Sequence, residues 1–231
     1  MNKDHLPAKS SSQDIDRFLQ TAAKTPVATQ QAGRLLFALD ATASRQPSWD
    51  TACQLHSELF LATRDLGGLA IQLCYYRGFN EFHAGAWVTS ADALLRAMNG
   101  VRCLGGHTQI AKVLKQALAE TRQKAVKAVI LVVDCCEEPA DELSQLAGEL
   151  GLLNTPVFVF QEGQDAHASQ VFGQIAQLSG GALSAFDHRS PAVLKALLGA
   201  VAVYASGGRT ALEQFSRNAP SEVKRLTQQL K

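Results

Sequence analysis

Runs of apolar residues alternate along the chain with stretches in which apolar residues recur at helical spacing. Three of the runs are continuous: RLLFALD at 34–40, AVILVVD at 128–134 and TPVFVFQ at 155–161. Continuous apolar runs are typical of parallel strands buried on both faces. Helical spacing predicts helices between them, at 48–66, 108–124, 138–150 and 169–178. Strands that alternate with helices predict an α/β fold with a doubly wound, mostly parallel sheet.

The segments at 69–78 and 79–88 depart from this alternation. LAIQLCYYRG and FNEFHAGAWV are separated by little more than Gly78, which predicts a tight hairpin. One antiparallel edge strand therefore joins the parallel sheet. Thr89 or Ser90 caps a helix at 91–99, ALSAF at 182–186 is a short strand, and Pro191 opens a last long helix to about Ser206.

Three regions follow from this pattern. Residues 1–33 form an N-terminal tail, polar at first and then carrying apolar residues at helical spacing between Ile15 and Ala22. Residues 34–206 form the domain itself. Gly207 and Gly208 end the last long helix, and 207–231 form a polar helical C-terminal tail.

Composition narrows the class of protein. The 231 residues are 46% hydrophobic and 19% charged, with a formal net charge of +1, so charge gives no argument for binding nucleic acid. No uninterrupted apolar run is long enough to predict a membrane span, and the N-terminus lacks the apolar core of a signal peptide. The five cysteines have no repeated spacing. We therefore expect a cytoplasmic protein without membrane contact, and small Ala- and Gln-rich stretches suggest a bacterial chain.

Two predicted central strands end in aspartate. Asp40 closes the first and Asp134 closes the fourth. Ligands of such sheets bind beyond the carboxyl ends of the strands, where the strand order reverses. Thr42 and Ser44 follow Asp40 at alternate positions, and Thr108 follows a Gly-Gly pair at the start of a helix. If the two strands are neighbours, all five oxygen-bearing side chains converge.

Three hydroxyls and two carboxylates suit a hard cation with near-octahedral oxygen ligands. Mg²⁺ fits this set best, followed by Mn²⁺ and then Ca²⁺, whereas zinc prefers nitrogen and sulfur. With few direct negative charges, such an ion stays electrophilic and keeps a position open for an anionic ligand.

At these residues the sequence resembles the von Willebrand factor A (VWA) family, whose metal-ion-dependent adhesion site (MIDAS) is written D-x-S-x-S, then Thr, then Asp. Asp40–Ser44 reads D-A-T-A-S, with Thr42 in place of the first Ser, and Gly105–Ile110 reads G-G-H-T-Q-I. The likeness covers about residues 33–206. It implies a Rossmann-like VWA fold and direct metal contacts from Thr42, Ser44 and Thr108. It also implies contacts through water from Asp40 and Asp134, and a partner's Asp or Glu as the last ligand.

Residues near the predicted site could contact a partner, but each also has an interpretation that involves no ligand. Arg45 either repels the metal or holds an incoming carboxylate, and we favour the second; His107 and Trp49 are further candidates for partner contact. A His in a Gly-rich loop usually only faces solvent, and the helical spacing of Trp49 favours core packing. Thr108 alone is typical of a helix N-cap.

The alternative function is a metal-dependent phosphohydrolase on the same kind of sheet. A haloacid dehalogenase-like enzyme needs a second Asp two residues after the first, where Thr42 stands here, and a Lys near the site. There is no P-loop motif, no dinucleotide fingerprint, and no evident partner for a Ser nucleophile. The residues therefore favour an interaction module over an enzyme.

Overall fold

The apolar runs form the centre of one six-stranded sheet. The structure is a computed structural model that describes residues 32–187 and 190–230. The strand order is β3-β2-β1-β4-β5-β6. The strands are β1 (Gly33–Asp40), β2 (Leu69–Arg77), β3 (Glu81–Val88), β4 (Ala128–Val133), β5 (Val157–Glu162) and β6 (Ala182–Phe186). All pairs are parallel except β2 and β3, which confirms the predicted sheet with its antiparallel edge strand.

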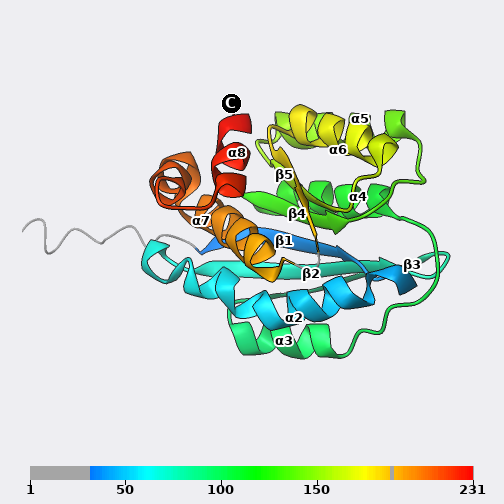
Figure 1. The fold of residues 1–231 in the computed structure, drawn as a ribbon, viewed down its shortest axis with the longest axis horizontal. Coiled ribbons are helices and arrows are strands. Elements are labelled where there is room, and N and C mark those ends of the chain that lie inside the picture. Colours follow the sequence, from blue (N-terminus) through cyan, green and yellow to red (C-terminus); the bar gives the residue numbers. More distant parts are fainter. Residues whose placement is uncertain (1–31, 188–189, 231) are drawn as a thin grey trace, which may run out of the picture. The chain divides into compact units, whose positions relative to one another are not determined.

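Helices cover both faces of the sheet, and Figure 1 shows α2 and α3 on the opposite side of the strands from α5 and α6. The helices are α2 (Gln46–Leu61), α3 (Ala91–Asn99), α4 (Ile110–Gln123), α5 (Ala140–Leu152), α6 (Ala166–Ser179), α7 (Pro191–Ser216) and α8 (Ser221–Gln229), with short 3-10 turns η1 (Ala43–Arg45) and η2 (Arg64–Leu66). Alternate residues of β1 enter different cores: Leu35 and Phe37 pack with α2, α3, α7 and α8, whereas Leu36 and Ala38 pack with α4, α5 and α6. Burial on both faces is why this strand shows no polar alternation.

The C-terminal region differs from the prediction. The helical path is interrupted at Gly208 (φ 70°, ψ −167°), as the Gly-Gly pair indicates, but α7 resumes beyond it to Ser216. Residues 207–230 are not a separate tail, because they belong to the same compact unit as the sheet. Val223 and Leu226 of α8 are fully buried in the core beside the sheet. Val223 and Leu226 are three residues apart, so they lie on the same face of α8, and that face packs against the core. The mostly polar composition of the region does not indicate this packing. The helix expected between Ile15 and Ala22 lies outside the described residues.

Helix α7 is, by length and composition, apolar enough to cross a membrane, and it is the one such helix in the described part of the chain. Half of its most apolar 18-residue window is buried inside the domain. Leu194, Leu197 and Val201 belong to the core that also holds β1 and β4. This burial is what a core helix requires, and the expected lack of membrane contact stays a prediction.

A polar cluster around Glu120 ties the edge of the sheet to α4. Its carboxylate accepts hydrogen bonds from Arg34 of β1 (2.6 Å), Gln72 of β2 (3.0 Å), Trp87 of β3 (3.0 Å) and Gln116 of α4 (3.1 Å). The Arg34 guanidinium also lies 3.8 Å from the centroid of the Trp87 ring. Burial alone would raise the pKa of Glu120, but these hydrogen bonds outweigh it and lower the pKa. One carboxylate therefore joins three strands and a helix.

We expect Glu120→Gln to lower the free energy of unfolding by about 2 kcal/mol, because it leaves the buried Arg34 without its counter-charge. Urea denaturation at neutral pH measures this loss. Since the pKa of Glu120 is lowered in the folded state, the contribution should be complete above its unfolded pKa and shrink as the pH falls through the folded value. The matched control is Glu149→Gln, whose partner Arg122 is exposed; a change there above about 0.5 kcal/mol would contradict the distinction.

Candidate metal centre

Asp40 and Asp134 lie at the same edge of the sheet. The strands that precede them, β1 and β4, are parallel neighbours with Leu39 paired to Val132. Asp40 is the last residue of β1, and Asp134 directly follows β4. The strand order reverses between these two strands, so both carboxylates reach the switch point at which open α/β sheets bind ligands. This confirms the neighbour relation on which the predicted site depends.

A cavity of about 210 Å³ opens at this edge. Its walls come from the ends of β1 and β4 and from the loop before α4, and its lining residues are Asp40, Thr42, Ala43, Ser44, Gly105, Gly106, Thr108, Cys135 and Glu137. Four of the five predicted ligands therefore share one cavity. The fifth, Asp134, lines an adjoining cavity that Ser44 also lines, and Ser44 Oγ lies 3.5 Å from Asp134 Oδ2.

The carboxylate of Asp40 is buried, with only 3% of the residue exposed. Its Oδ1 accepts a hydrogen bond from the Thr42 backbone N–H at 2.7 Å, whereas its Oδ2 has no partner. Burial raises the pKa of Asp40 from 3.8 to about 6, although hydrogen bonds from Thr42 oppose the rise. A buried anion held in this way gains from a nearby cation.

Thr108 is held by reciprocal hydrogen bonds with Glu137. The Thr108 N–H donates to Glu137 Oε2 at 3.0 Å, and the Glu137 N–H donates to Thr108 Oγ1 at 3.1 Å. The N-cap interpretation of Thr108 is wrong, because α4 begins at Ile110 and its first N–H groups donate to the carboxylate of Glu138. Thr108 is thus positioned beside the cavity without being used to cap the helix.

The two glycines before Thr108, Gly105 and Gly106, differ in how closely other backbone approaches them. A Cβ on Gly106 would lie 2.0 Å from the Gly78 carbonyl oxygen, so only glycine allows the loop to pack against the β2–β3 hairpin. A Cβ on Gly105 would meet nothing within 4 Å. The His107 N–H donates a hydrogen bond to the Gly78 carbonyl oxygen at 3.2 Å, which stabilises the close packing of Gly106 against Gly78.

We expect Gly106→Ala to destabilise the fold by about 2 kcal/mol and to weaken metal binding, because backbone must move against backbone next to Thr108. Gly100→Ala is the control and should leave both properties unchanged, because a Cβ there would lie 4.0 Å from the nearest atom and Gly100 does not line this cavity. Thermal unfolding and Mg²⁺ titration of the two variants measure these effects. Equal behaviour of the two variants would contradict the packing argument.

Arg45 is placed differently from the expectation. It is 3% exposed and forms an ion pair with Glu162, and its Nη1 lies 3.8 Å from Asp134 Oδ2. It therefore contacts carboxylates of its own chain instead of reaching outward to a partner. Glu162, the last residue of β5, also accepts a hydrogen bond from Ser48, which lies inside α2 and does not cap it. Glu162 was not predicted from the sequence, although it too is an acidic residue at the end of a buried strand.

Trp49 and His107 differ in their access to a partner. Trp49 is 2% exposed and packs edge-on against Tyr75, with ring centroids 5.8 Å apart, so the partner-contact role suggested for it is wrong. Its helical spacing correctly favoured the core. The His107 side chain is 62% exposed and its Nδ1 lies 3.1 Å from Glu137 Oε2. A contact between His107 and a partner stays a prediction.

Buried side-chain atoms without a hydrogen-bond partner gather at this site. In the part of the chain that the structure describes, they are Asp40 Oδ2, Asp134 Oδ1, Arg45 Nε and the Tyr76 hydroxyl. Tyr76 pairs with Asp40 in the register of β1 and β2, and its complete burial raises its pKa, with a further rise from the charges of Asp40 and Asp134. Nearly all buried polar atoms in proteins have partners, so this concentration indicates a place built for a polar ligand. Sequence reasoning gave Tyr76 no role, since alternate burial along a strand carries no such signal.

The side-chain atoms around the cavity that could coordinate a metal ion are mainly oxygens. No group of three or more His, Cys, Asp or Glu is placed to hold a metal among the described residues. Cys135 lines the cavity, but burial raises the pKa of its thiol to about 12, and it forms no disulfide with Cys136. A protonated thiol is a poor metal ligand. The hydroxyl and carboxylate set therefore fits a hard divalent cation.

No protein-family model and no curated protein matches the chain. Several solved structures do match the chain. A von Willebrand factor type A protein from Catenulispora acidiphila matches with a TM-score of 0.60 and 19% identity, over 77% of this chain and 43% of that chain. The SpRpn10 VWA domain matches with a TM-score of 0.56 and 11% identity, over 71% of this chain and 95% of that one.

A third match is proximal thread matrix protein 1 from the mussel byssus, in a structure with a zinc-occupied MIDAS motif. It has a TM-score of 0.56 and 15% identity, over 76% of this chain and 47% of that chain. This chain therefore spans less than half the length of the Catenulispora and mussel proteins. Together these likenesses show that residues of this chain adopt the VWA fold, as the resemblance implied.

Proposed function

We propose that this domain binds a divalent cation, Mg²⁺ ahead of Mn²⁺ and Ca²⁺, and uses it to bind an acidic side chain of a protein partner. The observation that carries this proposal is the concentration of unpartnered buried polar atoms beside a cavity lined by hydroxyls and carboxylates. The VWA fold supports it, because the mussel protein with that fold carries a metal at its MIDAS.

The residues have distinct expected roles. The hydroxyls of Thr42, Ser44 and Thr108 would contact the ion, and Asp40 and Asp134 would hold it through water. A bound cation supplies positive charge that attracts a carboxylate. Three neutral hydroxyls leave most of that charge uncompensated, and Arg45 offsets part of the negative charge of Asp134.

The phosphohydrolase alternative gains no support from the cavity. Thr42 occupies the position at which such an enzyme needs its second aspartate. Within the described part of the chain, the residues that line this cavity include no lysine.

A cytoplasmic location, suggested by five unpaired cysteines, belongs to the same proposal.

Calorimetric titration of chelator-treated full-length protein with MgCl₂ tests the metal site. Thr108→Val should weaken Mg²⁺ binding at least about tenfold, since it replaces one ligand oxygen by a methyl group (about 1.4 kcal/mol). Thr210→Val, on the exposed side of α7, is the control. Absence of Mg²⁺ and Mn²⁺ binding in the wild-type protein would overturn the proposal. Mg²⁺-dependent turnover of a generic phosphoester that Asp40→Asn abolishes would favour the hydrolase instead.

A further inference from the structure

An exposed aromatic residue lies on the hairpin beside the candidate metal centre. Phe79, in the turn between β2 and β3, is 80% exposed, although a phenyl ring gains from burial. Its ring packs edge-on against His107, with centroids 5.3 Å apart. Leu104, in the same loop as His107, is 46% exposed. We call Phe79, Leu104 and His107 the Phe79 rim.

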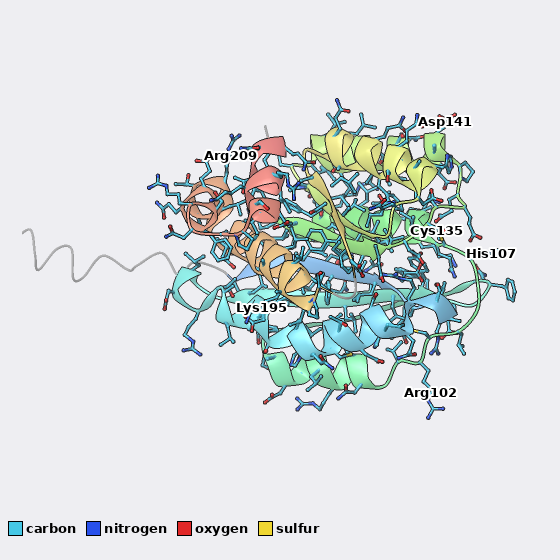
Figure 2. The ribbon with its side chains drawn as sticks, in the orientation of Figure 1. Arg102, His107, Cys135, Asp141, Lys195 and Arg209 are labelled. Carbon is cyan, nitrogen blue, oxygen red and sulfur yellow. The ribbon has the colours of Figure 1, made fainter. Side chains whose placement is uncertain are left out.

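The Phe79 rim is continuous with the metal cavity. Leu104 and His107 flank Gly105 and Gly106, which line that cavity. The Leu104 N–H donates to the carbonyl of Ala41, between Asp40 and Thr42, at 3.0 Å. His107 directly precedes Thr108, and Figure 2 shows it at the same end of the domain as Cys135, another lining residue. A ligand that extends out of the cavity along this loop therefore meets the exposed side chains of the rim.

Hydrogen bonds brace the backbone on either side of the rim. Gln109 Nε2 donates to the Arg77 carbonyl at 3.1 Å, and Arg77 Nη1 donates to the Arg102 carbonyl at 2.7 Å. Lys112 Nζ donates to Asn80 Oδ1, beside Phe79, at 2.6 Å. These bonds join the hairpin to the loop before α4 and to α4 itself. An aromatic side chain presented on braced backbone loses little conformational freedom on binding, as binding hot spots require.

We propose that the Phe79 rim is the specificity surface for the partner, and that it binds an apolar side chain close in sequence to the acidic residue that reaches the metal. The inference rests on the proposed metal-dependent binding. Successive residues of an extended segment are about 3.5 Å apart, so an apolar residue one to three positions from the acid spans the step from Thr108 to the rim. The partner is thus an extended acidic segment with an adjacent aromatic or long aliphatic residue.

Synthetic pentapeptides of the form Gly-X-Glu-X-Gly, with X as Gly, Lys, Leu or Phe, test this by fluorescence anisotropy with the full-length protein. In the presence of Mg²⁺, Phe and Leu peptides should bind at least about tenfold more tightly than the Gly peptide, and chelator should release them. Phe79→Ser should remove this preference but leave the Mg²⁺ affinity unchanged. Leu152→Ser is the matched control, because Leu152 is 86% exposed and ends α5 at the opposite edge of the sheet.

The outcomes separate the two proposals. Chelator-sensitive binding of all peptides with equal affinity, or a preference that survives Phe79→Ser, would overturn the rim and leave the metal site standing. A Phe79→Ser variant that alters only self-association, measured by sedimentation, would also overturn it. If Mg²⁺ binds but chelator releases no peptide, the proposed carboxylate binding fails as well.

Discussion

Asp40→Asn is expected to abolish Mg²⁺ binding and at the same time to stabilise the metal-free protein at neutral pH. Burial raises the pKa of Asp40 to about 6, so the ionised carboxylate is disfavoured in the folded state. A displacement from 3.8 to about 6 corresponds to about 3 kcal/mol. The amide has nearly the same shape without the charge. We therefore expect a gain of up to about 3 kcal/mol by urea denaturation, together with at least about a hundredfold loss of Mg²⁺ affinity.

The pH dependence follows with a definite sign. Between pH 3.8 and about 6 the folded metal-free protein holds a proton on Asp40 that the unfolded chain has lost. The Asp40 contribution to stability therefore falls as the pH rises through this range and is constant above it. Mg²⁺ competes with that proton, so its affinity should fall as the pH drops below about 6. Differential scanning calorimetry with and without Mg²⁺, across this range, measures both trends.

Asp65→Asn is the control for both properties, since Asp65 is exposed in η2 at the other edge of the sheet. It should change neither the metal-free stability nor the effect of Mg²⁺. An Asp40→Asn variant that is less stable than the wild-type protein in chelator would contradict the claim that the carboxylate is held at a cost. It would mean that the hydrogen bond from Thr42 to the carboxylate dominates.

The sequence predicts the sheet well because its signals are local. A continuous apolar run ending in aspartate identifies both β1 and β4 as buried strands. Their pairing as neighbours comes from the structure, because β2, β3, α3 and α4 separate them in the chain. The D-x-T-x-S and Gly-Gly patterns place hydroxyls at the ends of those strands. Asp40, Thr42, Ser44 and Thr108 consequently come together as expected.

Contacts between distant residues were not predictable in the same way. Arg45 and Glu162 are separated by more than a hundred residues, and nothing near Arg45 in sequence indicates its burial. Glu138 caps α4 from another loop, so the local N-cap pattern at Thr108 misleads. The burial of Tyr76 depends on the core that it shares with residues of α4, α5 and α6. Such features require the tertiary arrangement, because no spacing rule relates the residues involved.

Arg45 and Glu162 are expected to control metal affinity in opposite directions. Arg45 is shared between Glu162 and Asp134. Glu162→Gln removes one of its two carboxylate partners, so the guanidinium should turn toward Asp134 and oppose the metal. Arg45→Gln removes the competing cation. We expect Mg²⁺ affinity to fall about tenfold in the first variant and to rise about tenfold in the second, measured by calorimetric titration.

The free energy of unfolding should fall in both variants, although their Mg²⁺ affinities change in opposite directions. This difference distinguishes an electrostatic effect on the metal site from a loss of affinity caused by destabilisation. Each single variant breaks the ion pair between Glu162 and Arg45, which is 3% exposed, and should lower the free energy of unfolding by about 3 kcal/mol. The double variant Arg45→Gln with Glu162→Gln removes both charges and should recover much of that loss while it keeps the tighter Mg²⁺ binding. If both single variants shift the Mg²⁺ affinity in the same direction, Arg45 supports the local structure and does not tune the charge of the site.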